Sequence, residues 1–210
     1  MTFSIIARDP DSGIFGVAVS TAVPCVGAMV PHVKPGVGAI AKQSYTNVRL
    51  GIDGLPLLEQ GMSPEEALTL LLAKDSQAAL RQCAGIDARG RVFAYSGEQC
   101  VDWYGHRPGE NYSVQGNMLV GKETVDAMAD AFESSRGHLS SRLLKALEAG
   151  QTAGGDKRGR ESAALLVAPF LNEDGKIDVR VDLHDDPVAE LRRIFNLMRE
   201  RYRQQLEQGG

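Results

Sequence analysis

The first twenty residues constrain the fold more than any other part of the sequence. Two apolar, β-branched runs, 2–8 and 14–20, flank the segment Asp9-Pro10-Asp11-Ser12-Gly13. Proline fixes φ for a turn, aspartate side chains accept hydrogen bonds from turn amides and glycine accepts positive φ, so the pattern predicts a β-hairpin. Both runs are almost continuously apolar, which indicates central strands that are buried on both faces.

A central strand that begins at residue 2 is unusual, because chain termini are normally peripheral. If Met1 is removed, which the small size of its neighbour Thr2 permits, the strand begins with a free α-amine beside a hydroxyl. These two groups suffice for acyl transfer: the hydroxyl is the nucleophile, and the amine, with a pKa of about 7.7–8.0, is its general base. Thr2 is therefore the first candidate catalytic residue. The alternative is that Thr2 merely starts a β-strand, where threonine is common.

Composition narrows the class of protein. The 210 residues suit one domain, 1–210, and the net charge of −4, without a basic patch interleaved with aromatics, disfavours nucleic-acid binding. We expect no membrane association, because no apolar run approaches the ~20 residues of a membrane span. Three widely spaced cysteines without a CxxC motif argue against a disulfide framework or zinc site and favour the cytoplasm. We expect neither a cofactor nor a metal.

The rest of the chain alternates runs of strands with runs of helices. Residues 21–36 read as an irregular loop, and 105–109 as another. The expected strands are 36–41, 83–88, 91–95, 100–104, 112–119, 162–168 and 177–183; the expected helices are a broken one over 48–58, then 63–73, 75–83, 123–132, 139–149 and a C-terminal amphipathic helix at about 186–207. This order predicts an α+β fold of two mostly antiparallel sheets with helices outside and the N-terminal hairpin in the middle.

Several segments together resemble domain-of-unknown-function family 1028. They are 2–10, Gly36-Val37-Gly38-Ala39, Gln115-Gly116-Asn117, 154–159 and 162–167, and they occur in order over nearly the whole chain. The resemblance implies a four-layer αββα sandwich similar to that of the N-terminal-nucleophile hydrolases. It implies no particular reaction, because the family has none assigned.

Three further residues are candidates for a catalytic role beside Thr2. Lys34, expected near the end of the second strand, could lower a neighbour's pKa by its charge, or it is a solvated loop lysine. Gln43 is expected to begin a helix after a glycine-rich strand, where backbone N–H groups could stabilise an oxyanion; an ordinary helix cap is the alternative. Asn47, one turn later, could orient a carbonyl or simply bond the backbone.

Five residues are candidates for substrate binding. Asp156 and Arg158 lie in the charged loop 154–160, which suits a zwitterionic or amide substrate or, alternatively, an exposed turn that pairs with another subunit. Gln115 and Asn117 flank a glycine on a strand, where their amides must bond backbone or ligand. His106 could wall a pocket with the neighbouring Trp103, or bond locally.

Two functions from different classes fit these observations. The first is an amidohydrolase or peptidase-like enzyme that cleaves a small amide bond through Thr2. The second is a non-catalytic protein on the same fold that binds a small molecule or assembles with other subunits, because no second set of catalytic residue types stands out. We expect a homo-oligomer in either case.

Overall fold

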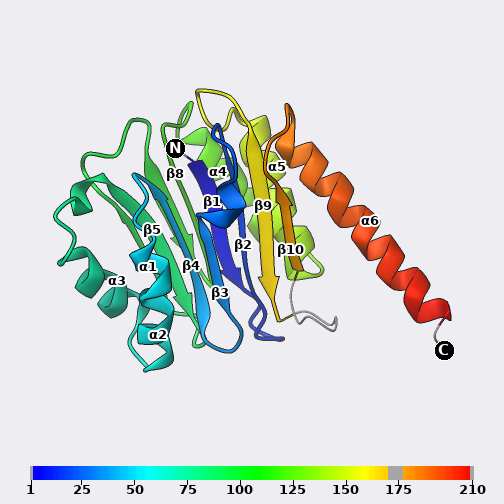
Figure 1. Cartoon of the computed structure of the whole chain (residues 1–210), viewed down its shortest axis with the longest axis horizontal. Helices are drawn as coiled ribbons and strands as arrows, with labels where there is room; N and C mark the ends of the chain where they lie inside the picture. The colour runs from blue at the N-terminus through cyan, green and yellow to red at the C-terminus, as the bar shows by residue number, and fades with distance from the viewer. Residues whose placement is uncertain (1, 170–176, 209–210) are drawn as a thin grey trace.

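The computed structural model describes residues 2–169 and 177–208, in which two antiparallel β-sheets lie face to face (Figure 1). The first sheet has the spatial order β10 (Ile177–Val181), β9 (Ser162–Ala168), β2 (Phe15–Thr21), β1 (Thr2–Arg8), β8 (Tyr112–Asn117) and β7 (Gly105–Gly109). The second has the order β3 (Pro31–Lys34), β4 (Gly38–Ser44), β5 (Arg81–Asp87) and β6 (Val92–Ser96). The N-terminal hairpin β1–β2 is thus central in the larger sheet, as its apolar composition predicts.

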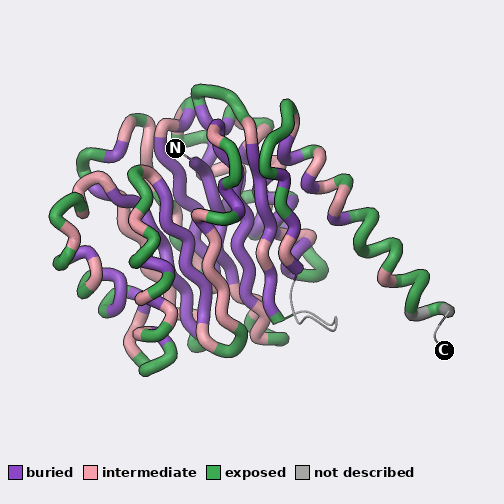
Figure 2. Tube along the Cα trace, in the orientation of Figure 1, coloured by how far each residue is buried: buried purple, intermediate pink, exposed green. Residues whose placement is uncertain are grey.

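Helices cover the outer face of each sheet, which gives an α+β sandwich of four αββα layers (Figure 1). Over the larger sheet lie α4 (Glu123–Ser134), α5 (Leu139–Thr152) and α6 (Pro187–Gln208). Over the smaller sheet lie α1 (Arg49–Ile52), α2 (Gly54–Glu59) and α3 (Pro64–Leu72). Two short 3-10 helices, η1 (Val26–Ala28) and η2 (Ala78–Leu80), lie in connections. The second half of α6 projects away from the sandwich and is largely exposed (Figures 1 and 2).

The alternation of side chains along β1 separates two of the hydrophobic cores. Phe3 and Ile5 face the helices and pack in a cluster with residues of α4, α5 and α6. Ile6 faces the other way, into a cluster between the sheets that includes Ala41 and Ala84. A third cluster lies between the smaller sheet and α1–α3. Because both faces of the central strands are covered, they are buried along nearly their whole length (Figure 2).

Local sequence signals set several element boundaries. Ser63 accepts a hydrogen bond of 3.2 Å from the backbone N–H of Glu66, and the carboxylate of Glu66 accepts one of 2.7 Å from the N–H of Ser63, so the capping box predicted for α3 forms. Gly16 on β2 lets α5 approach closely, because a Cβ built there would lie 2.4 Å from Cδ1 of Leu143. The broken helix predicted over 48–58 is the pair α1 and α2.

The sequence-based assignment is wrong for two edge strands, β3 and β7, whereas the edge strands β6 and β10 lie where strands are predicted. β3 and β7 each pair on one side only, and they fall in segments expected to be loops. Their sequences, PHVK and GHRPG, lack an apolar period because an edge strand is partly solvated and tolerates proline. Residues 100–104 are not a strand; Val101 and Trp103 instead bond irregularly to the backbone of Met118 and Leu119. Residues 81–83, expected to end a helix, begin β5.

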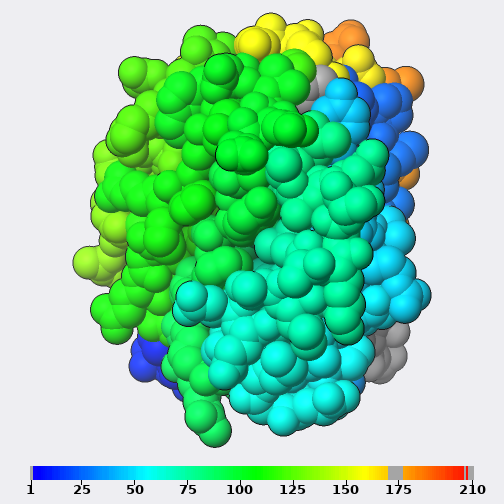
Figure 3. Space-filling model, turned by 90° about the vertical axis from the view of Figure 1, so that its left-hand side faces the viewer, coloured from blue at the N-terminus to red at the C-terminus, as the bar shows by residue number. Residues whose placement is uncertain are grey.

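The edge strands β6 and β7 of the two sheets meet and close one side of the sandwich. Figure 3 views this side, where the green segment that contains β7 meets the blue-green segment that contains β6. Oγ of Ser96 on β6 lies 2.9 Å from Nδ1 of His106 on β7. The two sheets are therefore joined at this side by a polar contact.

Candidate functional site

Thr2 lies where the central strand β1 begins, between Thr21 on β2 and Asn117 on β8. Both are its direct cross-strand partners, so the three side chains emerge on the same face of the sheet. That face is the inner one, because Ser4, two residues further along β1, bonds Gln43 of the smaller sheet. The hydroxyl of Thr2 donates a hydrogen bond of 3.2 Å to Oγ1 of Thr21. Thr2 is 4% exposed.

The side chain of Gln43 joins the two sheets directly behind Thr2. Its Nε2 lies 3.2 Å from the carbonyl oxygen of Thr2 and 3.3 Å from that of Gln115. Its Oε1 accepts a hydrogen bond of 2.7 Å from the hydroxyl of Ser4. These contacts fix the start of β1 against β4, and they hold the Thr2 backbone from a strand 41 residues away in sequence.

Gln82 on β5 is the centre of this buried network. Its Oε1 accepts hydrogen bonds from Nε2 of Gln43 at 2.8 Å and from Nδ2 of Asn117 at 2.9 Å. Its Nε2 donates to the carbonyl of Gly116 at 2.7 Å and to the hydroxyl of Ser96 at 2.8 Å. Since Ser96 also contacts His106, a continuous chain of polar contacts runs from Thr2 to the surface at His106.

Asn117 contains the one unpaired amide oxygen of this network within residues 2–169 and 177–208. Its Oδ1 is buried without a hydrogen-bond partner, although its Nδ2 is bonded to Gln82. A buried polar atom left unpaired costs roughly 1–3 kcal/mol. Because Asn117 is directly opposite Thr2, this acceptor lies beside the candidate nucleophile.

The charged loop 154–160 packs over the same end of the larger sheet. The carboxylate of Asp156 is buried and accepts a hydrogen bond of 3.2 Å from the N–H of Ala22, the residue after β2. Arg158 forms an ion pair of 2.8 Å with Asp156, and its side chain is 31% exposed. The loop is also tied to the end of β8, because the N–H of Lys157 bonds the carbonyl of Met118. Asp156 thus holds the loop in place, and Arg158 is one of its solvent-accessible charges, together with Lys157 and Arg160.

Lys42, on the opposite face of β4 from Gln43, is fully buried in the outer half of the sandwich. Its side chain points away from the Thr2 network, on the face where its cross-strand partner Cys83 packs below the helices. The ammonium nitrogen has no hydrogen-bond partner in the described part of the chain. Burial lowers the pKa of Lys42 to about 8, because the charged form loses its hydration. Burial, together with the charge of Lys42, lowers the pKa of His32.

Residues 2–191 match the profile of the "Family of unknown function (DUF1028)". The chain belongs to this family. The crystal structure of the DUF1028 protein SPO2555 from Silicibacter pomeroyi is similar, with a TM-score of 0.86 and 34% sequence identity over 93% of this chain and 84% of that one. No curated protein shows a match.

The substrate-binding candidates predicted from the sequence fall into two groups in the structure of our chain. Gln115 and Asn117 belong to the buried network, and Nε2 of Gln115 donates a hydrogen bond of 2.6 Å to the hydroxyl of Ser4. Asp156 and Arg158 lie over the end of the sheet at which β1 begins. His106 is exposed at the far end of the polar chain, and partial desolvation of its ring lowers its pKa, which favours the neutral imidazole.

The location predicted for Lys34 is wrong. Lys34 ends β3 beside the β3–β4 turn and forms a half-exposed ion pair of 2.6 Å with Glu59. It pairs with Gly38, whereas Gln43 reaches Thr2 from the other end of β4, five residues and therefore about 17 Å away. The sequence pattern does not reveal β3, and without this strand the direction of the chain after β2 cannot be predicted. For that reason Lys34 is expected near the site, although it lies far from it.

Gln43 and Asn47 also differ from the prediction in their local structure. Gln43 lies within β4 and pairs with Gln82 across the strands, so the helix start expected there, with its outward N–H groups, does not exist. The first helix after it begins at Arg49, where the side chain of Asn47 accepts a hydrogen bond from the backbone N–H. Asn47 also donates to Asp75 at 2.6 Å and thus stabilises this connection. Gln43 acts instead through its side chain.

The prediction missed Gln82, Ser4 and Thr21 as members of the network. A signal was present for Ser4 and Thr21, since both are small hydroxyl residues at the inward positions of otherwise apolar strands. Gln82 was assigned to a helix, so its alternation with the buried residues of β5 could not be recognised.

The cysteines, the possible metal-ligating side chains and the helices of the described residues bear on whether the chain has a further site or a membrane span. The three cysteines form no disulfide, and burial next to Cys100 raises the pKa of Cys83 to about 12. No group of three or more His, Cys, Asp or Glu side chains in residues 2–169 and 177–208 is arranged to hold a metal. Over the same residues, no helix combines the length and apolar character needed to cross a membrane.

Proposed function

We propose that this protein is an amide-bond hydrolase that uses Thr2 as an N-terminal nucleophile after Met1 is removed. The observation that carries the proposal is the position of Thr2 at the start of a central strand, with its hydroxyl on Thr21 at 3.2 Å and its carbonyl on Gln43 at 3.2 Å. These hydrogen bonds hold Thr2 within the central strand β1 between β2 and β8. The αββα layers and the resemblance to N-terminal-nucleophile hydrolases support the same conclusion.

In the proposed reaction, Oγ1 of Thr2 attacks the carbonyl carbon of an amide. The α-amine of Thr2 accepts the hydroxyl proton and passes it to the leaving amine as the C–N bond breaks. This leaves an ester between the acyl group and Thr2, and water activated by the same amine hydrolyses it. An amine with a pKa of about 7.7–8.0 needs little tuning for this role at neutral pH.

The network behind Thr2 supplies rigidity rather than a second acid or base. The hydrogen bonds of Gln43 and Thr21 restrict the backbone and hydroxyl of the nucleophile, which lowers the entropic cost of reaching the reactive geometry. Among the substrate-binding candidates, Asn117 is directly opposite Thr2, and Arg158 offers a guanidinium group suited to a substrate carboxylate. We propose these two as the substrate contacts.

The test begins with the state of the N-terminus. Intact-mass measurement of the protein should show loss of Met1, and a fusion cleaved directly before Thr2 should give the same active species. Such protein should hydrolyse members of a panel of acyl-amino acids and aminoacyl amides, and Thr2→Ala should abolish turnover while the exposed threonine variant Thr69→Ala retains it. Thr2→Ser should keep part of the activity. Turnover by protein that retains Met1, or by Thr2→Ala, would refute the proposal.

A second function, binding or assembly without catalysis, is favoured by a different observation. Thr2 is 4% exposed, and Gln43 and Gln82 direct their amides to protein groups. In this alternative the network is purely structural, and the surface carries the function. A ligand that raises the melting temperature of wild type and Thr2→Ala equally, without turnover, supports it.

Self-association is compatible with either function, and we propose that α6 mediates it. Val188, Leu191 and Phe195 of this helix are buried in the core, but Leu197 is 37% exposed and Met198 is 40% exposed on the half that leaves the sandwich (Figure 1). A second copy that covers this half would remove that apolar surface from water. Light scattering should give a mass above that of one chain, and Met198→Glu should lower it. An unchanged mass for the variant contradicts a contact at α6.

A further inference from the structure

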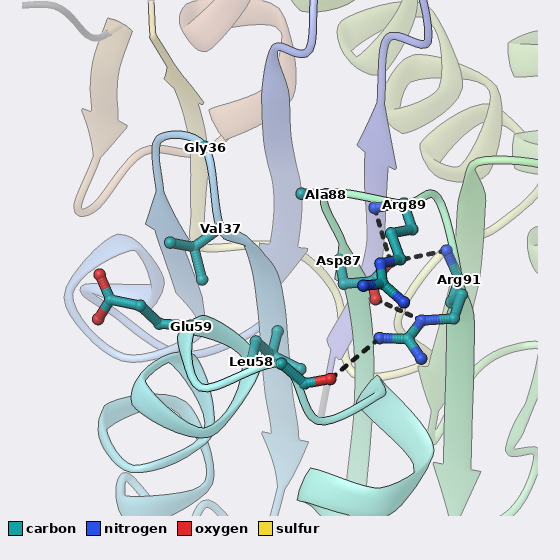
Figure 4. Close-up of a pocket in the computed structure, with 9 residues that line it drawn as sticks. Gly36, Val37, Leu58, Glu59, Asp87, Ala88, Arg89 and Arg91 are labelled. Atoms are coloured by element: carbon teal, nitrogen blue, oxygen red, sulfur yellow. Dashed lines mark hydrogen bonds and ion pairs between the residues drawn. The ribbon is translucent and has the colours of Figure 1, made fainter.

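A pocket opens at the end of the sandwich opposite Thr2. It lies where the β3–β4 turn, the end of α2 and the β5–β6 turn meet (Figure 4). Its volume is about 260 Å³. Pockets for drug-sized ligands measure roughly 300–1,000 Å³, so this one suits a ligand of only a few non-hydrogen atoms.

One wall of the pocket carries two guanidinium groups and a single carboxylate. Asp87, whose side chain is 5% exposed, accepts a hydrogen bond of 2.6 Å from Nε of Arg91 (Figure 4). It also accepts bonds from the backbone N–H groups of Arg89 and Arg91, so it orders the whole turn. Arg91 additionally reaches the carbonyl of Gly61 at 3.5 Å. The guanidinium of Arg89 has no hydrogen bond or ion pair anywhere in residues 2–169 and 177–208.

The charges around the pocket therefore do not balance. Glu59, the other carboxylate in its lining, is paired with Lys34 at 2.6 Å. Asp87 is paired with Arg91, which leaves the positive charge of Arg89 without a counter-charge. This is a local excess of positive charge on a chain whose net charge is −4. An anion of single charge restores the balance.

The facing wall is largely apolar, because the carboxylate of Glu59 on this side is directed away from the two arginines (Figure 4). Val37 from the β3–β4 turn and Leu58 from α2 line it, on the other side of the pocket from the two arginines (Figure 4). An inorganic anion cannot use this surface, and a neutral apolar molecule cannot use Arg89. The nearby carboxylate of Asp87 also disfavours a doubly charged anion such as phosphate more than a singly charged one.

We infer that this pocket binds a small monocarboxylate with a short aliphatic body. The carboxylate lies against Arg89 and the free edge of the Arg91 guanidinium, and the aliphatic part packs on Val37 and Leu58. Arginine suits this role because its planar fork matches a carboxylate in two hydrogen bonds. The inference is independent of the proposed hydrolase, because the pocket lies at the other end of the strands from Thr2.

The test uses isovalerate as the probe and two-dimensional amide NMR of the full chain as the readout. Isovalerate should shift the backbone amides of residues 88–91 and 37 in a saturable way, with a dissociation constant of roughly millimolar order for a ligand of this size. Isoamyl alcohol, which lacks the charge, and phosphate, which lacks the apolar body, should each bind at least about fivefold more weakly.

Two variants separate a specific site from general attraction. Arg89→Gln should weaken isovalerate binding about tenfold, whereas Arg201→Gln, an exposed arginine on α6, should leave it unchanged. Arg89 makes no side-chain contact that folding requires, so both variants should melt like wild type. The inference is overturned if isovalerate causes no saturable shift at 100 mM, about a hundred times the affinity expected. It is equally overturned if Arg89→Gln binds as well as wild type, or if phosphate binds as tightly as isovalerate.

Discussion

Replacing Lys42 by methionine should stabilise the protein, although it removes a charged residue from an acidic chain. Lys42 is fully buried, with an exposed fraction of 0%. Its ammonium nitrogen has no hydrogen-bond partner in the described part of the chain. A buried ammonium without a counter-ion or hydrogen bond is a net cost to folding. Methionine fills a similar volume without the charge.

The size of the effect follows from the pKa of Lys42, which burial lowers from 10.5 to about 8. At 1.36 kcal/mol per pKa unit, this difference corresponds to about 3 kcal/mol of unfolding free energy. The sign is set by proton binding. Between pH 8 and 10.5 the unfolded chain holds the proton and the folded chain does not, so stability rises with pH. Below pH 8 both states are charged and the full penalty is present.

Urea unfolding at several pH values measures this directly. At pH 7, Lys42→Met should be about 3 kcal/mol more stable than wild type, and by pH 10.5 the difference should fall to within about 1 kcal/mol. The matched control is Lys34→Met, which removes a lysine that is 44% exposed in an ion pair on the neighbouring strand. That variant should change stability by less than about 1 kcal/mol at either pH. In Lys42→Met, the pKa of His32 should also rise, because the charge of Lys42 contributes to lowering it.

The reasoning is refuted if Lys42→Met is less stable than wild type at pH 7. It is also refuted if the difference between the two proteins does not change between pH 7 and 10.5. Either result means that the ammonium group has an interaction in solution that offsets its burial. An unchanged His32 pKa would show that the two groups do not sense each other.

Three other substitutions test the framework around the site. Gln82→Leu should cost at least about 3 kcal/mol in urea unfolding, because Ser96 and the carbonyl of Gly116 lose their donor; a cost below 1 kcal/mol contradicts the network. Hydrogen bonds from Arg81 hold the pKa of Asp75 well below its usual range, so the ionised carboxylate stabilises the folded state at neutral pH and this stabilisation is lost on acidification. Asp75→Asn should therefore cost about 3 kcal/mol of unfolding free energy at pH 7 and progressively less towards pH 2. Ser63→Ala should lower stability by about 1 kcal/mol, and no loss would mean that the capping box contributes nothing.

The sequence predicted the parts of this protein that neighbouring residues decide. The hairpin β1–β2 was recognisable from two apolar runs around a turn, and α3 from a capping serine followed by proline and glutamate. Strand Ser162–Ala168 has the predicted bounds, because a continuous apolar run marks a strand that is buried on both faces. From these the layered α+β class follows, since such strands need helices or a second sheet on each side.

The candidate site was predictable only in part. Thr2, Gln115 and Asn117 were identified from their position on strands, and the structure brings Thr2 and Asn117 directly together. Gln43 was predicted to begin a helix, but it lies in strand β4. It nevertheless contacts Thr2 through its side chain, whose orientation no local sequence pattern indicates. Lys34 was misplaced, because an edge strand with a polar sequence reversed the chain between β2 and β4.

What the sequence by itself determined is therefore which segments are strands or helices and which of their faces are apolar. The tertiary structure alone decided that Gln43, Gln82 and Asn117 converge, that Lys42 is sealed under helices and that Arg89 faces a pocket. The physical reason is range. Periodicity and capping act over a few residues, whereas the packing of two sheets against each other joins groups 35–41 positions apart, and its register depends on the whole core.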